Sequence, residues 1–541
     1  MKKSISVLLI IISLISCKSK EKADLIVYNA TIYTVNNDFA KADAFAVKDG
    51  KFIAVGTLAD LKKNYTATDE LNAQGQTIVP GLIDAHCHFF GLGLQQQKVD
   101  LEGTKSYDEV LQRLKDFQQQ KQVNFITGRG WDQNDWPVKE FPTKEKLDVL
   151  FPNTPVAITR IDGHALLVNQ TSLNLAGIDN NTKISGGEII KKNGKITGVL
   201  IDNAMDLVYD QIPNPSKKEQ IQALLDAEKI CTNLGLTTVD DAGLSKDNLE
   251  LIDSLQQAGA LKIRIYGMVS ATSQNLDYYI RKGTLKTARL NIHSFKVYAD
   301  GALGSRGAAL RQPYSDQHQH YGALVTPIDE LKAIAKKIAA SEFQMNTHAI
   351  GDSANHFILE MYHQVLNGKA DRRWRVEHAQ VISPEDFKYF KEMMPSIQST
   401  HATSDMYWAG DRLGKLRLKG AYAYKDLLNQ YTKVALGTDF PVEKVSPMLT
   451  FYAAVARQDL DNFPKDGFQM ENALTREETL KGMTIWAAYS NFEETEKGSI
   501  EVGKLADFII LDQDIMTVEI HEVPKIKVVA NYINGDKISL N

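Results

Sequence analysis

The sequence predicts an α/β protein: a (β/α)8 barrel of the TIM type with a small composite β-sandwich made from the two ends of the chain. One observation is that short apolar runs such as SFKVYADGAL and WRVEHAQVI alternate with helical stretches such as KKEQIQALLDAEKICTNLG. Strands that alternate with helices indicate parallel βαβ units, and this many units favour a closed barrel over an open sheet. The other observation is that both ends of the chain read as antiparallel strands.

The first residues are predicted to be a targeting segment. Residues 1–16 have two lysines directly after Met1 and carry an apolar run from Val7 to Ile15, which is typical of a secretory signal peptide. The ending LISC resembles a bacterial lipobox and predicts cleavage before Cys17 and lipidation of that residue. Residues 17–23 would then be a short charged tether. We expect a lipoprotein anchored to a membrane of the bacterial cell envelope, on the periplasmic or outer side; a plain signal peptide with an incidental cysteine is the alternative.

Residues 24–80 and 492–541 are expected to form the sandwich together. Both segments alternate apolar and polar residues, and Asn534-Gly535 is a typical two-residue hairpin turn. Each end alone is too small to bury a core well, so one shared domain is the economical interpretation.

Residues 81–491 are expected to form the barrel. The part between about 103 and 215 is longer than one or two βα units need. We therefore expect an insertion there that lies over the barrel mouth as a lid.

The composition favours a small-molecule partner. The chain of 541 residues has a formal net charge of −5 and 24% charged residues, so it has no basic excess to attract nucleic acid. The sequence does not indicate an oligomeric state.

The segment PGLIDAHCHFFGLG carries the first chemical signal. Side chains alternate between the two faces of a strand, so His86 and His88 point the same way while Cys87 points the other way. Two imidazoles therefore converge on one spot.

Four more polar residues follow apolar runs further along the chain. They are Lys296 in SFKVYADG, His348 in MNTHAIGD, His378 in RVEHAQ and Asp439 in ALGTDFP. A barrel gathers the carboxyl ends of its strands at one mouth, so all four are expected near the two histidines. Each alone has an ordinary structural explanation, but together and in this order they indicate a divalent metal site. Zinc is the first choice, and cobalt, manganese and iron are also consistent.

These motifs resemble those of the amidohydrolase superfamily. PGLIDAHCHF, SFKVYADGALGSRGA and GTDFPV are similar to the motifs of its amidohydrolase-3 branch, the YtcJ-like and N-substituted formamide deformylase-like metal-dependent hydrolases. GRGWDQNDWP, DGHALLVN and QSTHATSD also look like this branch. The resemblance covers nearly the whole chain after the signal peptide.

The resemblance implies a site for one or two divalent metal ions. It assigns the more buried metal to His86, His88 and Asp439, and a second metal to His348 and His378.

The resemblance also gives Lys296 and Asp439 their roles. Lys296, if carboxylated by carbon dioxide, would bridge the two metals; in a one-metal site it would be a spectator or a hydrogen-bond donor. A metal lowers the pKa of bound water from about 15.7 towards about 7, and Asp439 would pass the water's proton to the leaving nitrogen.

Further side chains in the branch-like segments are expected at the substrate. His164 would polarise the substrate carbonyl as a second catalytic residue, or hold the polar end of the substrate. The expected substrate contacts are Trp131, Asp132, Trp136, Arg306 and His401. Core packing is the alternative for the tryptophans, and an ion pair with Asp300 is the alternative for Arg306.

The expected function is a hydrolase of carbon–nitrogen bonds other than peptide bonds, of the EC 3.5 type, acting on N-acyl or N-formyl amines. One alternative is deamination of a cyclic substrate, against which Lys296 counts. The other is a tethered lipoprotein that binds a ligand or metal without turnover, against which Asp439 counts.

Overall fold

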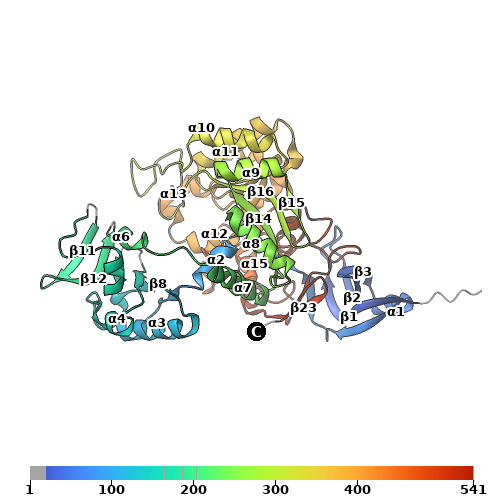
Figure 1. Ribbon diagram of the computed structural model, residues 1–541. Helices are drawn as coiled ribbons and strands as arrows, with labels where there is room; N and C mark the ends of the chain where they lie inside the picture. Colours follow the sequence, from blue (N-terminus) through green and yellow to red (C-terminus); the bar gives the residue numbers. More distant parts are fainter. Residues whose placement is uncertain (1–19, 162, 164, 185–186, 203, 540–541) are drawn as a thin grey trace, which may run out of the picture.

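The structure is a computed structural model that describes residues 20–539 except 162, 164, 185–186 and 203. A barrel forms the centre, a separate lobe projects on one side, and a β-rich domain lies on the other side (Figure 1). The predicted signal peptide and Cys17 lie outside the described residues. Within the described residues, no helix combines the length and the apolar character needed to cross a bilayer.

Eight parallel strands build the barrel, which confirms the predicted fold class. In sheet order they are β6 (Leu82–Cys87), β13 (Leu236–Leu244), β14 (Arg264–Ser270), β16 (Leu290–Tyr298), β17 (Gln344–Ala349), β18 (Arg375–His378), β19 (Met394–Gln398) and β20 (Ala435–Gly437). The short strand β15 (Leu285–Lys286) pairs with β16 outside this order. The ring closes just beyond the strand ends, where the Asp439 amide donates to the His86 carbonyl at 2.8 Å and the His88 amide to the Phe440 carbonyl at 2.8 Å.

Helices connect the strands, and several begin at the side-chain caps that their sequences provide. Ser216 and Glu219 form a capping box at the start of one helix, and Ser245 and Asn248 do the same at the next. The helices of the barrel region are α2 (Phe89–Gln95), α7 (Lys217–Asn233), α8 (Lys246–Gln257), α9 (Ser273–Lys282), α10 (Ile328–Ala339), α11 (Asp352–Leu366), α12 (Ser399–Asp405), α13 (Ala409–Leu418), α14 (Tyr424–Tyr431), α15 (Pro447–Ala456), α16 (Arg476–Gly482) and α17 (Ile485–Ser490). Their apolar faces and the outward faces of the strands share one large core.

The β-rich domain combines strands from both ends of the chain in one eight-stranded sheet. Its strands are β1 (Glu21–Tyr33), β2 (Lys41–Lys48), β3 (Lys51–Gly56), β4 (Tyr65–Asn72), β5 (Thr77–Pro80), β21 (Phe508–Leu511), β22 (Val528–Ile533) and β23 (Asp536–Ile538), with α1 (Leu58–Asn64) beside them. Antiparallel pairing of β5 with β21 joins the two ends. Phe45 from one end packs edge-on against Phe508 from the other, with ring centroids 4.8 Å apart. The two ends therefore share one core.

The lobe is an insertion with a six-stranded sheet of its own. Its elements are β7 (Val99–Asp100), α3 (Tyr107–Lys121), β8 (Ile126–Trp131), α4 (Glu145–Leu150), β9 (Val156–Arg160), β10 (Ala165–Val168), α5 (Gln170–Leu175), β11 (Gly187–Lys192), β12 (Lys195–Asp202) and α6 (Asp206–Tyr209). Two hydrophobic clusters fill it, separate from the barrel core. An ion pair connects it to the barrel, with Lys121 Nζ 2.7 Å from Asp226 Oδ2.

Buried charges connect the barrel to the β-rich domain. Arg264 on β14 donates two hydrogen bonds to the Asp507 carboxylate. Its Nε lies 2.6 Å from Oδ2, and a second guanidinium nitrogen lies 3.0 Å from Oδ1. Both side chains are almost completely buried. The backbone N–H of Asn534 donates to the same carboxylate at 2.8 Å, so this cluster fixes the C-terminal strands against the barrel.

Candidate metal centre

The six predicted metal ligands lie at one end of the barrel. His86 is the next-to-last residue of β6, and His88 is the residue just before α2. Lys296 and His348 lie close to the ends of β16 and β17, His378 is the last residue of β18, and Asp439 lies two residues beyond β20. Carboxyl ends of barrel strands meet at one mouth, and these side chains are gathered there.

Two of these residues have an unusual backbone. His378 has φ 73° and Asp439 has φ 62°, in the left-handed region that residues other than glycine rarely occupy. Such conformations are costly and cluster at functional sites, where the surrounding structure imposes them. At both positions the left-handed turn sets the direction of the side chain as the chain leaves its strand.

The imidazoles of His86 and His88 meet the carboxylate of Asp439. Asp439 Oδ1 lies 3.5 Å from His86 Nε2 and 3.2 Å from His88 Nε2, and the three atoms lie within 4.8 Å of one another. Burial raises the pKa of Asp439, but His88, His378, His86 and His401 outweigh it and hold this pKa well below the ordinary value. The carboxylate is therefore an anion.

Each imidazole presents Nε2 to the centre because a second group occupies its Nδ1. His86 Nδ1 lies 2.6 Å from Glu377 Oε2, and His88 Nδ1 lies 3.0 Å from the Ala242 carbonyl oxygen. His378 Nδ1 lies 2.7 Å from Gln398 Oε1. All three Nδ1 atoms face acceptors, so Nδ1 carries a proton in each ring and Nε2 is the nitrogen that can offer a lone pair to a metal. Three imidazole nitrogens and one carboxylate are a donor set that fits a divalent transition metal.

Lys296 lies in the same place and is almost completely buried. Its Nζ is 2.9 Å from His86 Nε2. Burial lowers the pKa of Lys296 to about 8, against the opposing effect of Glu377 and Asp439. Burial and the lysine lower the pKa of His86 to about 4. The site thus disfavours positive charge on both groups, and an uncharged amine is accessible near neutral pH.

His348 and His401 complete the ring of histidines. The His348 and His378 ring centroids are 4.5 Å apart, and the His401 ring stacks on His378 at 5.8 Å. His401 Nε2 lies 3.9 Å from Asp439 Oδ2. The Nε2 atoms of His348 and His401 are buried and have no hydrogen-bond partner among the described residues. Buried polar atoms are rarely left without a partner, so these two also fit a centre that binds a ligand.

A model of the amidohydrolase family (Amidohydro_3) matches residues 69–538. The chain belongs to the amidohydrolase family. The amidohydrolase motifs found in the sequence are thereby confirmed as a family relationship.

Three curated proteins are similar over most of the chain. Protein LONG AFTER FAR-RED 3 from Arabidopsis thaliana is 34% identical, with 95% of this chain and 91% of the relative covered. Putative amidohydrolase YtcJ from Bacillus subtilis is 32% identical, covering 93% and 97%. N-substituted formamide deformylase from Arthrobacter pascens is 26% identical, covering 95% and 97%.

A solved structure from Pyrococcus horikoshii, described as an uncharacterized metal-dependent hydrolase, matches with a TM-score of 0.76. It is 27% identical, with 92% of this chain and 99% of that chain covered. The family, this likeness and the ligand cluster together make the protein a metal-dependent hydrolase.

The predicted substrate residues of this amidohydrolase lie in different places. Trp131 and Trp136 are buried in the core of the lobe, where the Trp131 indole donates to the Ile158 carbonyl at 2.9 Å. Asp132 pairs with Arg160, with Oδ1 and a guanidinium nitrogen 2.5 Å apart. His164 lies outside the described residues. In this structure the tryptophans pack in a core, the alternative given for them above.

Arg306 forms an ion pair, but with a different partner from the Asp300 considered above. Its guanidinium binds Asp316, with the closest nitrogen 2.8 Å from Oδ2. Asp300 is instead held by the backbone amides of Ala309, Ile350 and Gly351 at 2.8 to 3.0 Å. A carboxylate that already accepts three amide hydrogen bonds has little need of a cation.

Sequence reasoning missed the side chains behind the ligands. Glu377, Arg375 and Gln398 are buried at the metal centre. Glu377 and Arg375 are two residues apart in the RVEH segment, so in a strand both side chains lie on the same face. That signal identified the face but not the partner, because His86 lies 291 residues away in the sequence.

Tyr298 was also missed. Its ring lies over Lys296, with Nζ 4.9 Å from the centroid, and 5.7 Å from the His348 ring. It is 41% exposed, which places a large side chain at the open side of the centre.

A cleft of about 900 Å³ lies beside the centre, between the barrel and the lobe. Gly91, three residues after His88, and Pro441, two residues after Asp439, line its barrel side. Arg129 and Tyr209 are among the residues on the lobe side. No predicted metal ligand lines the cleft itself, but the cleft adjoins two of the segments that carry them.

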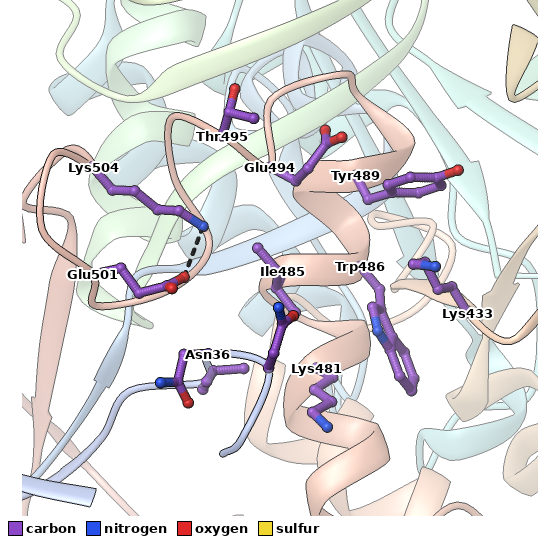
Figure 2. Close-up of a pocket in the computed structure, with 12 residues that line it drawn as sticks. Asn36, Lys433, Lys481, Ile485, Trp486, Tyr489, Glu494, Thr495, Glu501 and Lys504 are labelled. Carbon is purple, nitrogen blue, oxygen red and sulfur yellow. Dashed lines mark ion pairs between the residues drawn. The ribbon is translucent and has the colours of Figure 1, made fainter. Parts of the chain in front are cut away.

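A second cavity, of about 510 Å³, lies elsewhere (Figure 2). Lys433, just before β20, and Tyr489 on α17 line it, as does Asn36 from the β-rich domain. It is thus at the amino end of the strands, and none of the predicted metal ligands lines it.

Proposed function

We propose that this amidohydrolase cleaves carbon–nitrogen bonds other than peptide bonds, in amides of the N-acyl or N-formyl amine type. The observation that carries the proposal is the position of Asp439. Its buried Oδ1 has no hydrogen-bond partner among the described residues and faces the Nε2 atoms of His86 and His88. The similarity to a protein named N-substituted formamide deformylase supports this substrate class.

The residues that would hold a divalent metal are His86, His88, His348, His378 and Asp439. When bound, the metal, with zinc as our first choice, would polarise the substrate carbonyl and acidify water. Asp439 is anionic, so its carboxylate can accept a proton from the attacking water and deliver it to the leaving nitrogen. The imidazoles of His86, His88 and His401 lie within 3.2 to 3.9 Å of that carboxylate.

We propose that Lys296 becomes carboxylated. The uncharged amine adds to carbon dioxide and releases one proton, which leaves a carbamate anion in place of a buried amine. The depressed pKa of Lys296 favours the reactive free amine. A carbamate oxygen is an anionic ligand suited to a site with two metals.

The rest of the substrate would lie in the cleft beside His88. The exposed ring of Tyr298 and the imidazole of His401 would then border the reacting amide, and His164 would polarise its carbonyl. This arrangement leaves the lobe to contact the part of the substrate that does not react.

The test is amine release from a panel of N-formyl, N-acetyl and longer N-acyl compounds. Zinc-loaded or manganese-loaded protein is compared with Asp439→Asn carrying the same metal content. Release above that blank supports an amide hydrolase and identifies its acyl preference. Asp439→Asn with near-normal turnover and metal bound would reject the proton-transfer role. No amine release from any compound of the panel would reject the substrate class.

We also propose that Cys17 is lipidated and anchors the protein to a membrane of the bacterial cell envelope. The support is the LISC ending of the signal-like segment. Mass spectrometry of the mature N-terminus tests it: a diacylglyceryl adduct on Cys17 is expected and Cys17→Ala should abolish it. An unmodified Cys17 in the mature membrane fraction would rule the anchor out.

A further inference from the structure

A chain of buried charged and polar side chains runs behind the metal centre. Glu377 Oε2 lies 2.6 Å from His86 Nδ1, and Oε1 lies 3.1 Å from Arg375 Nε. The Arg375 guanidinium also reaches Asp240 Oδ2 at 3.0 Å, and the Asn491 amide donates to Asp240 Oδ1 at 2.7 Å. All of these side chains are fully buried, so bulk water does not reach them and each depends on its protein partners.

Glu377 distinguishes His86 from the other imidazoles. The acceptor at His88 Nδ1 is a backbone carbonyl and that at His378 Nδ1 is the Gln398 amide oxygen, and both are neutral. A carboxylate behind a ligating imidazole fixes its tautomer and its ring orientation, and it raises the basicity of the ligating nitrogen. Of these three rings, His86 therefore has the strongest support as a ligand.

Stability does not explain this arrangement. Taking a carboxylate and a guanidinium out of water is unfavourable for each ion, and their attraction often only balances that cost. Well-packed apolar side chains of the same size would serve the barrel interior as well. The charge on Glu377 lies directly against a ligand, where it has a chemical use.

We propose that Glu377 is a positioning residue that sets the metal affinity of the centre through His86. Arg375 and Asp240 keep the Glu377 carboxylate in place. The proposal concerns the metal alone, so it is independent of which amide the protein hydrolyses.

The test is zinc affinity, measured by competition with a chromogenic chelator at one fixed pH. Glu377→Gln keeps an oxygen acceptor of the same size but removes the charge. We expect zinc to bind about 10-fold to 100-fold more weakly, the usual effect of losing such an outer partner. Circular dichroism confirms that the compared proteins are folded. Affinity within twofold of wild type in folded Glu377→Gln would overturn the proposal.

Asp386→Asn is the matched control. Asp386 is also a buried carboxylate on a histidine, with Oδ1 2.9 Å from His356 Nδ1 on α11. If such carboxylate–histidine pairs had only a general structural role, both variants would lose zinc affinity to the same extent. The proposal instead predicts unchanged zinc affinity in Asp386→Asn. An equal loss in the control would overturn the proposal.

Glu377→Asp covers the case in which Glu377→Gln does not fold. This variant keeps the negative charge, but its side chain is one methylene shorter, so the carboxylate lies farther from His86 Nδ1. We therefore expect zinc to bind at least threefold more weakly. Unchanged affinity and an unchanged zinc dissociation rate in this variant would overturn the proposal. Weakened zinc binding together with no amine release from wild type would reject the proposed substrate class and leave the positioning role intact.

Discussion

Gly437→Ala should disable the metal centre without touching a ligand. Gly437 is the last residue of β20, two residues before Asp439, at the point where the barrel closes against β6. A methyl group there would lie 2.4 Å from the His86 backbone nitrogen and 2.8 Å from Asp84 Oδ1. Asp84 itself holds the junction, because its Oδ2 accepts from the Thr438 hydroxyl at 2.7 Å. The new methyl therefore presses on the backbone that positions two ligands.

The expected size of the effect follows from these distances. Ordinary carbon contacts begin near 3.5 Å, so the two strand ends must separate by about 1 Å. Overpacking of this kind costs about 1–3 kcal/mol of stability. A misplacement of about 1 Å at a reacting group can cost about 100-fold in rate. The loss of activity should thus exceed what the modest destabilisation explains.

The assay measures three quantities on the same protein: thermal midpoint, zinc content after dialysis, and amine release from the best substrate of the panel. Gly410→Ala is the control, since its methyl would meet only Leu418 Cδ2 at 3.8 Å and alanine favours the surrounding helix α13. We expect a folded Gly437→Ala protein with low zinc content and about 100-fold lower turnover. Turnover within threefold of wild type would refute the reasoning that this junction sets the ligand geometry.

Three further outcomes are expected. Asp507→Asn leaves the Arg264 guanidinium buried without its anion and should lower the free energy of unfolding by about 3–5 kcal/mol, measured by urea denaturation; a loss below 1 kcal/mol would show that the pair is dispensable. Burial raises the pKa of Glu493, but Lys497 and Lys286 outweigh burial and lower this pKa to about 2. The ionised Glu493 therefore stabilises the fold fully at pH values above the ordinary pKa of a glutamate, and this stabilisation is lost as the pH falls towards 2. Glu493→Gln should flatten the pH dependence of the free energy of unfolding, measured by urea denaturation, by about 2 kcal/mol between pH 5 and 3, and an unchanged slope would contradict this sign. Trp374→Ala, at a fully buried ring packed edge-on against Tyr362, should cost about 3–5 kcal/mol, with a shift in thermal midpoint as the measurement; a shift of only a degree or two would mean that the core relaxes around the gap.

The barrel and the convergence of its ligands could be predicted because their signals are local. Each strand is a short apolar run, and the polar residue that ends it falls at the mouth by the geometry of parallel strands. His348 on β17 and His378 on β18 meet although a helix and loops separate the two strands in the sequence, because β17 and β18 are paired in register. The same reasoning identified Asp439, because β20 closes the ring beside β6.

Tertiary packing decided what local signals left open. Trp131 lies in a motif-like segment, and its sequence fits a pocket wall or a core equally well. The lobe has its own hydrophobic cluster, and that cluster takes up the ring. The partner of Arg306 depended on the path of the loop from residue 300 to 325, which brings Asp316 to the guanidinium and directs Asp300 to backbone amides. No periodic pattern fixes such a loop.

The left-handed backbone at His378 explains how β18 supplies two different parts of one centre. In a regular strand, neighbouring side chains point to opposite faces, so an interior Glu377 would leave the next residue facing the surrounding helices. With φ 73°, His378 instead packs its ring 5.0 Å from that of His86, while Glu377 holds His86 from behind. One strand end thus provides a predicted ligand and the support of a predicted ligand from another strand. Its strained backbone and its buried charge both cost free energy, and both are found at the same place, beside the metal centre.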